Sequence, residues 1–94
     1  MIPAFQSHSE TSRLAALSMY ERASTLQRIL LDWLEAKGGL TDEEMQTISG
    51  IPPSTQRPRR IELVGKGLVR DSGAKRKTVS GRQAVVWEIV IDGR

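Results

Sequence analysis

Cysteine is absent from the 94-residue chain, and histidine occurs only once, at His8. These absences exclude disulfides and thiolate metal sites, and a single imidazole cannot form a zinc site. Aromatic residues are scarce as well, with one Phe, one Tyr and two Trp, and no apolar run is long enough to span a membrane. The first ten residues lack the charged and apolar regions of a signal peptide. We therefore expect a soluble cytoplasmic protein with no cofactor and no metal.

Recognisable catalytic motifs are missing too. The sequence has no Gly-x-Ser-x-Gly elbow and no phosphate-binding glycine-rich loop. The acidic cluster Asp42, Glu43 and Glu44 fits a helix start, where carboxylates interact favourably with the helix dipole. We expect neither an enzyme nor a small-molecule ligand.

Charge is distributed unevenly along the chain. Residues 1–50 hold four Arg and Lys against seven Asp and Glu, whereas residues 51–94 hold ten against four. The second half is therefore strongly basic, although the net charge of the whole chain is only +3. A basic half within one small domain indicates a face that meets a polyanion. The alternative is a basic surface that is merely solvated.

The chain is long enough for one domain, which we divide into a polar tail (1–10), a helix-prone extension (11–23) and a main domain (24–94). Ser24-x-x-Gln27 fits a capping box, and the apolar residues that follow it recur at helical spacing up to a stop at Gly38. Whether the extension and this helix form one rod or two is left open by the sequence.

Thr41-x-x-Glu44 is a second capping box, and it predicts a short helix that closes at Ser49-Gly50. Pro52-Pro53 then separates this helix from a third, for which Ser54 or Thr55 would supply the N-cap. With Thr55 as the cap, Pro58 falls in the first turn, where its missing N–H costs nothing. The third helix is expected to run to Val64 and to break at the glycines that follow.

A β-hairpin is predicted for the rest of the chain. One strand starts at Leu68, and a second, rich in β-branched residues, covers residues 84–90. Ser80-Gly81 is the expected tip, Gly73 the expected bulge, and a minimal third strand is expected near Gly39-Leu40. Both tryptophans are in phase with aliphatic neighbours, so we assign them to the core and not to base stacking. The predicted core is Leu26, Ile29, Leu30, Trp33, Leu34, Met45, Ile48, Ile51, Leu63, Leu68, Val85, Trp87 and Ile89.

The candidate binding residues lie on the third helix and the hairpin. They are Ser54, Thr55, Gln56, Arg57, Arg59, Arg60, Lys75, Arg76, Lys77 and Arg82. With Leu63 inward, Arg57 points outward and could grip a guanine edge, whereas Ser54 and Thr55 suit a phosphate. Arg59 and Arg60 have an alternative structural role, as partners of Glu62 or of acids on the earlier helices. The hairpin cations could reach phosphates or a minor groove.

The segment from Leu40 to Val90 resembles the winged helix-turn-helix family of DNA-binding domains. The similarity lies in the Thr-Asp-Glu-Glu start, the turn around Gly50, the Glu-Leu-Val-Gly-Lys-Gly-Leu-Val exit and the Trp in the last strand. Residues 59–63, Arg-Arg-Ile-Glu-Leu, are also similar to a pattern of small stand-alone winged-helix proteins of bacteriophages and prophages. The resemblance implies an α+β fold with a three-helix core and a C-terminal hairpin wing, preceded here by an extra N-terminal helical segment.

The resemblance also implies a function. We expect a non-enzymatic protein of phage or bacterial type that binds double-stranded DNA and regulates transcription, with helix 54–64 in the major groove and wing 73–82 on the backbone or in the minor groove. The alternative is a winged helix used for protein–protein contact in a phage or replication complex. Leu14, Leu17, Met19 and Tyr20 of the extension could serve that contact, or a homodimer.

Overall fold

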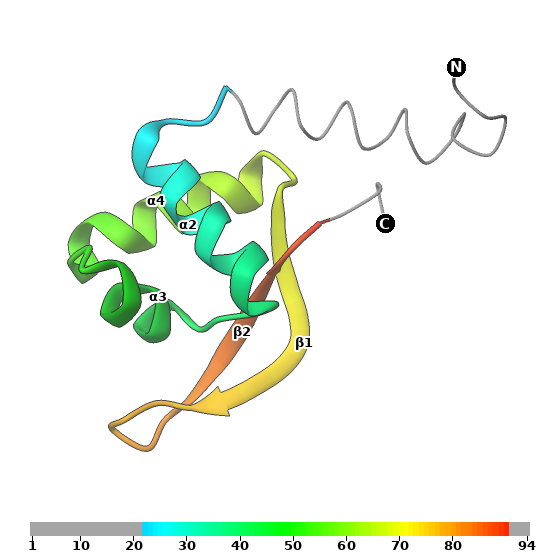
Figure 1. The fold of residues 1–94 in the computed structure, drawn as a ribbon. Coiled ribbons are helices and arrows are strands. Elements are labelled where there is room, and N and C mark those ends of the chain that lie inside the picture. The colour runs from blue at the N-terminus through cyan, green and yellow to red at the C-terminus, as the bar shows by residue number, and fades with distance from the viewer. Residues whose placement is uncertain (1–21, 91–94) are drawn as a thin grey trace, which may run out of the picture.

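Three helices followed by a two-stranded antiparallel hairpin form the protein, as seen in the computed structural model, which describes residues 22–90 (Figure 1). The elements are α2 (Thr25–Lys37), α3 (Asp42–Ser49), α4 (Pro53–Gly65), β1 (Val69–Lys77) and β2 (Gln83–Ile89). This is the α+β winged-helix arrangement that the sequence predicts. The expected tail and all but the last two residues of the expected helical extension lie outside the described residues.

Both predicted capping boxes are confirmed. The Gln27 N–H donates to Ser24 Oγ at 3.2 Å, and the Ser24 N–H donates to Gln27 Oε1 at 3.0 Å. Thr41 and Glu44 repeat the pattern at the start of α3, with distances of 3.1 and 3.0 Å. Because Ser24 is an N-cap with extended backbone, the first helical residue of α2 is Thr25.

The predicted start of α4 is wrong by two to three residues. Pro52 is the N-cap and Pro53 the first helical residue, so Ser54 and Thr55 already lie inside the helix. No side chain caps this end; instead, the Pro52 carbonyl accepts from the N–H groups of Thr55 and of the residue after it. A proline at the first position has its φ already set for a helix and lacks an N–H that would be unsatisfied. Pro58 consequently falls beyond the first turn.

The hairpin follows the predicted plan. A register shift between Asp71 and Lys75 marks a bulge at Gly73, whose φ of 88° explains the glycine. The expected minimal third strand is an isolated bridge, in which Leu40 and Trp87 exchange backbone hydrogen bonds of 3.0 and 2.8 Å. This bridge joins the hairpin to the segment between α2 and α3.

The core lies where the three helices meet the base of the hairpin. Most of the predicted residues belong to it, six of them only half-buried at its margin: Leu26, Ile29, Trp33, Ile48, Trp87 and Ile89. The buried apolar residues that were not predicted from the sequence are Ala23, Leu31, Leu40, Val69 and Val86. Leu31 is buried beside Leu30 because α2 packs against α3, α4 and β2 together, which widens its apolar face.

The prediction that Val85 is a core residue is wrong. Val85 pairs with Lys75, beyond the bulge, where the hairpin leaves the helices, and its side chain lines an open groove. Val86 takes the buried place, against Gly39, where a Cβ would stand only 3.0 Å from Val86 Cγ1. The strand therefore passes close to Gly39 because that residue has no side chain.

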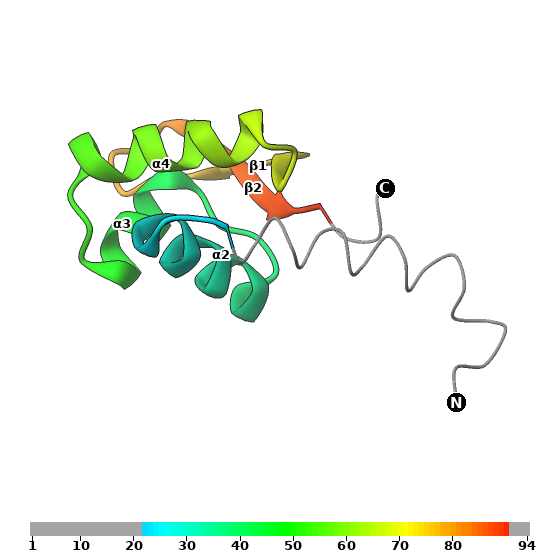
Figure 2. The same ribbon diagram turned by 90° about the horizontal axis from the view of Figure 1, so that it is seen from above.

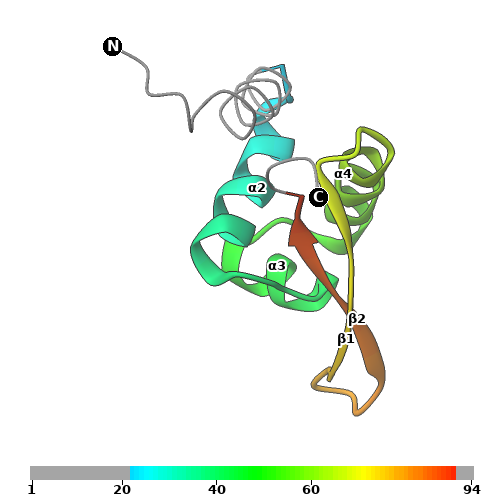
Figure 3. The ribbon, with the colours of Figure 1, turned by 90° about the vertical axis from the view of Figure 1, so that its right-hand side faces the viewer.

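Both α4 and the hairpin are accessible, and they lie at the same edge of the molecule. In Figure 2, α4 runs along one side of the molecule, with α2 and α3 on its inner side. In Figure 3, the hairpin extends beyond the helices, so that its tip projects past α3. A helix with one free side and a projecting hairpin are the two parts that a winged helix can present to a partner.

Candidate nucleic-acid interface

The residues of α4 divide between a buried and a free side, as the sequence predicts. Leu63 and Gln56 point inward with no measurable exposure, whereas Arg57 and Ile61 are exposed. Arg59 and Arg60 lie between these two sides and are partly covered. Arg57 is therefore free to contact a partner, whereas the contacts of Arg59 and Arg60 depend on the side chains that cover them.

Gln56 was expected to contact DNA, but its side chain is hydrogen-bonded within the protein. Its Nε2 donates to Asp42 Oδ1 at 2.9 Å, and its Oε1 accepts from Gln46 Nε2, also at 2.9 Å. Met45 Sδ lies 3.7 Å from the same Nε2. Because both ends of the buried amide are occupied by α3, Gln56 cannot reach an external ligand in this conformation. It instead fixes how α4 crosses α3.

Arg60 adopts the structural alternative. Its Nε and Nη2 donate to Asp42 Oδ1 and Oδ2 at 3.0 and 2.7 Å, a bidentate ion pair with side-chain exposures of 15% and 17%. The guanidinium plane also lies over the Trp87 ring, with Cζ 4.1 Å from the ring centroid. Arg60 therefore joins α4 to α3 and to β2, which leaves little of it for a partner.

Arg59 is also engaged within the protein. Its Nη2 donates to Glu62 Oε2 at 2.9 Å, and its Nε lies 2.8 Å from Glu62 Oε1. Glu62 in turn accepts from Gln27 Nε2 at 2.7 Å, and Lys66 Nζ donates to Gln27 Oε1 at 2.8 Å. The hydrogen bond from Gln27, followed by that from Arg59, holds the pKa of Glu62 below its ordinary value. These contacts place Arg59 on the side of α4 that faces α2.

Ser54 and Thr55 lie in the first turn of α4, with Ser54 exposed and Thr55 half-buried. The N–H of Thr55 already donates to the Pro52 carbonyl at 3.0 Å, and Pro53 has no N–H. The helix N-terminus therefore offers fewer free donors to a phosphate than an ordinary first turn does. The exposed Ser54 hydroxyl remains available.

The wing, which we define as residues 73–82, is held against the start of α3. Arg76 Nη1 donates to Glu44 Oε1 and Oε2 at 2.6 and 2.8 Å, and the Val79 N–H donates to Glu43 Oε1 at 2.9 Å. Burial raises the pKa of Glu44, but hydrogen bonds from Thr41 and the charge of Arg76 outweigh burial and hold this pKa below its ordinary value. Two acids of α3 thus fix the position of the wing.

The other cations of the wing are exposed. Lys75, Lys77 and Arg82 form no ion pair with any residue between 22 and 90, and the same is true of Arg57 on α4. Lys75 and Lys77 flank Arg76 on a strand, so their side chains leave the opposite face of β1 from the one that meets Glu44. Free and neutralised cations therefore alternate along the wing.

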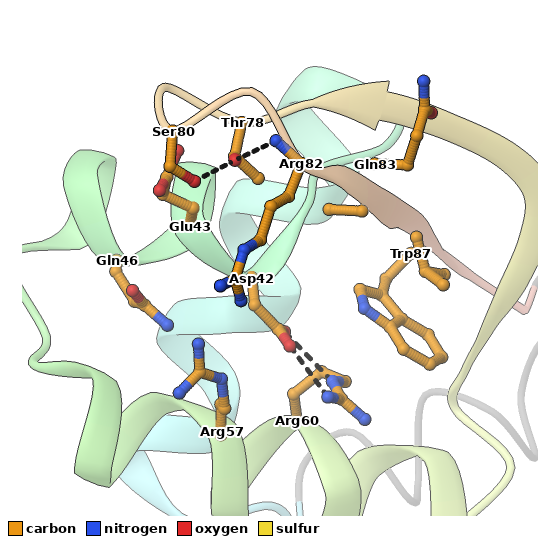
Figure 4. A pocket seen from close by; sticks show the side chains of 12 residues that line it. Asp42, Glu43, Gln46, Arg57, Arg60, Thr78, Ser80, Arg82, Gln83 and Trp87 are labelled. Carbon is orange, nitrogen blue, oxygen red and sulfur yellow. Dashed lines mark hydrogen bonds and ion pairs between the residues drawn. The ribbon is translucent and has the colours of Figure 1, made fainter.

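An open groove separates α4 from the wing (Figure 4). Arg57 enters it from α4 and Arg82 from the hairpin, so two unpaired guanidinium groups point into one space. The remaining lining residues are Asp42, Glu43, Gln46, Arg60, Thr78, Ser80, Gln83, Ala84, Val85 and Trp87. Gln46 is not among the residues predicted from the sequence, because its place opposite Arg57 depends on the angle between α3 and α4 and not on any motif.

None of the helices between residues 22 and 90 is long and apolar enough to cross a membrane. Within the same stretch, no three His, Cys, Asp or Glu side chains come together in a way that could hold a metal ion.

Comparison with known proteins identifies the fold. No protein-family model matches the chain, and no curated protein matches it. Among solved structures, it is similar to the crystal structure of YusO protein from Bacillus subtilis, a MarR-family winged-helix protein, with a TM-score of 0.57 over 93% of this chain and 17% sequence identity. The chain spans 58% of the length of YusO. Together with the element order, this similarity shows that the protein has a winged-helix fold.

Proposed function

We propose that this protein is a non-enzymatic double-stranded DNA-binding protein that acts as a transcriptional regulator of bacterial or phage type. In this proposal, α4 enters the major groove and the wing lies on the backbone or in the minor groove. The observation that carries the proposal is the distribution of free cations. The four exposed cations without an ion pair on α4 and the wing are Arg57, Lys75, Lys77 and Arg82.

The neutralised cations make this distribution informative. Arg59, Arg60 and Arg76 each have a carboxylate partner within the protein, so the structure keeps some arginines for its own stability. The remaining cations border the groove between α4 and the wing or lie on the wing itself. A surface that merely needed solubility would not require free cations on two separate elements that frame one groove. Binding to a polyanion does require free cations, because each Lys or Arg that contacts a phosphate releases a counterion, and this release drives binding.

The two elements would divide the work. Arg57 stands on the free side of α4, and a guanidinium can donate to both O6 and N7 of guanine. Lys75, Lys77 and Arg82 are on a projecting hairpin, where long cations can follow phosphates that carry no sequence information. Ser54, at the start of α4, would add a phosphate contact through its hydroxyl.

Protein–protein contact is the second candidate function. It is favoured by Val79 at the tip of the wing, an apolar residue whose side chain is 97% exposed among the described residues. Such a tip could insert into a pocket of another protein of a phage or replication complex. The two functions differ in their response to salt, since an apolar insertion is not weakened by added salt.

Selection of enriched sites from a random-sequence duplex library tests the proposed function. We expect the wild-type protein to enrich a short motif that contains a guanine, and Arg57→Ala to lose that enrichment while retaining duplex binding. Thr25→Ala, at an exposed uncharged position on α2 outside the groove, is the control and should select the wild-type motif. Paired motifs with centres about 10 base pairs apart would indicate that the protein binds as a dimer. We propose that such a dimer forms through the N-terminal extension. Failure to retain any duplex would refute DNA binding.

A further inference from the structure

The side of α4 that is furthest from the core carries an apolar residue. Helical spacing places Ser54, Pro58, Ile61 and Gly65 on one stripe, opposite the buried Gln56. Ile61 is 56% exposed, the most exposed large apolar residue on any described helix, and Val64 beside it is 37% exposed. Folding of the described residues gives no reason for an isoleucine at this position, because a polar residue would be equally compatible with the helix.

The surroundings of Ile61 restrict what can cover it. Arg57 lies four residues earlier, one turn away on the same side of the helix, and Arg82 stands across the neighbouring groove. Both cations are unpaired within residues 22–90. An apolar protein surface would have to desolvate these charges without compensation. A polyanion with an apolar group between its charges would satisfy the cations and the isoleucine together.

Duplex DNA has such a group in its major groove. The C5-methyl of thymine is the apolar mark by which a protein distinguishes an A·T pair there, and aliphatic side chains contact it. We propose that Ile61 contacts a thymine methyl and is a second specificity-determining residue of α4, beside Arg57. This inference rests on the proposed function and makes it more specific, because it assigns a base to a residue outside the basic set.

The spacing of the two residues also gives a spacing of bases. Four residues of an α-helix rise about 6 Å, which is close to the roughly 6.8 Å covered by two base steps. If α4 lies along the groove, the thymine stands about two steps from the guanine that Arg57 contacts. The selected motif is therefore expected to contain a guanine and a thymine in that relationship, on either strand.

Single replacement of thymine by deoxyuridine tests the contact, because this change removes only the methyl group. Binding of the selected duplex is measured by fluorescence anisotropy, with one thymine replaced at a time. We expect one replacement to weaken wild-type binding about fourfold, the value of one buried methyl group. Ile61→Ala should bind the thymine duplex more weakly and show no difference between thymine and deoxyuridine. Val64→Ala, at the neighbouring exposed position, is the matched control and should retain the difference.

Two results would overturn this inference. The first is salt-dependent wild-type binding that no deoxyuridine replacement weakens; Ile61 then contacts no methyl, although the proposed function stands. The second is a lower sedimenting mass of Ile61→Ala in the absence of DNA, which would place Ile61 in a protein interface. Complete absence of duplex binding by the folded wild-type protein is a separate outcome, since it refutes the proposed function as well. Melting of Ile61→Ala within a few degrees of wild type verifies that the variant is folded.

Discussion

Arg60 and Asp42 form a bidentate ion pair that connects the middle of α4 to the first residue of α3. The distances are 3.0 Å from Nε to Oδ1 and 2.7 Å from Nη2 to Oδ2, and both side chains are largely covered. The same guanidinium packs on Trp87 of β2, and the same Oδ1 accepts from Gln56. One carboxylate thus fixes α4 relative to α3, and one guanidinium fixes it relative to β2. The width of the groove between α4 and the wing depends on both.

Replacing Arg60 by Ala should lower the free energy of unfolding by about 2–4 kcal/mol, because it leaves the Asp42 carboxylate half-buried without its partner. Arg59→Ala is the matched control on the same helix. Its ion pair with Glu62 is more exposed, with side chains at 30% and 43%, and its loss should cost about 0–1 kcal/mol. Urea unfolding measures both values. Equal losses for the two variants would contradict the central role of Arg60.

Replacing Gln56 by Leu should destabilise the protein by about 1–3 kcal/mol, although leucine fills a similar volume. The change removes the hydrogen-bonding partner of Asp42 and of Gln46, and polar groups left without partners in a covered site lose free energy. Thermal melting gives the loss, and Gln83→Leu, at an exposed position, should melt like the wild type. A Gln56→Leu variant that melts normally but no longer binds its selected site would show that Gln56 reaches DNA after all.

The contact between Glu44 and Arg76 should make stability depend on pH. The pKa of Glu44 is lower in the folded protein than in the unfolded chain, so the charged form stabilises the fold. This contribution is fully present above the unfolded pKa of about 4.3 and is lost as the pH falls through the lower folded pKa. The difference in unfolding free energy between the wild type and Glu44→Gln should therefore shrink as the pH is lowered from about 6 to about 3.

Arg76→Ala provides the second half of this test, because it removes one of the groups that lower the pKa of Glu44. In an Arg76→Ala background, Glu44→Gln should cost less at neutral pH, and the cost should depend less on pH. A pH-independent cost of Glu44→Gln in the wild type would show that the pair contributes nothing to folding.

The sequence predicts the parts of this structure that depend on neighbouring residues. Ser24 and Gln27 cap α2 because each needs only a partner three residues away, and Gly73 allows a bulge by its own backbone freedom. Both features follow from local rules that do not depend on the rest of the fold. The start of α4 was misplaced because the Pro52 and Pro53 pair took precedence over the side-chain caps that follow.

The candidate site was harder to predict, because the role of each cation depends on partners far away in the sequence. The acids that pair with Arg60 and Arg76 are Asp42 and Glu44, which lie 18 and 32 residues away in the sequence, and only the fold brings each pair together. Helical spacing did indicate that Arg60 leans toward the core, which is the signal for an internal role. Side chains alternate along a strand, so Lys75 and Lys77 are expected on the opposite face from Arg76. The sequence does not indicate which of the two faces contacts an acid.

Arg57→Ala should weaken binding to the selected site by about 1–3 kcal/mol and leave binding to unrelated duplexes nearly unchanged. The reason is that a base edge differs from pair to pair, whereas phosphate charge is uniform along the duplex. Competition between a labelled selected site and unlabelled random duplex measures the two affinities together. Equal weakening on both duplexes would show that Arg57 contacts the backbone.

The salt dependence of duplex binding tests the account most directly. The affinity of the wild-type protein for a duplex is measured between about 50 and 200 mM salt and compared with that of a variant in which Lys75, Lys77 and Arg82 are all replaced by Ala. We expect log affinity of the wild type to fall steeply with log salt, and the slope of the variant to be flatter by about 0.9 for each lost phosphate contact. Arg76→Ala is the control, because Arg76 is already neutralised by Glu44 and should change the slope much less. Wild-type protein that binds no duplex in this range, or binds with no dependence on salt, would contradict the account.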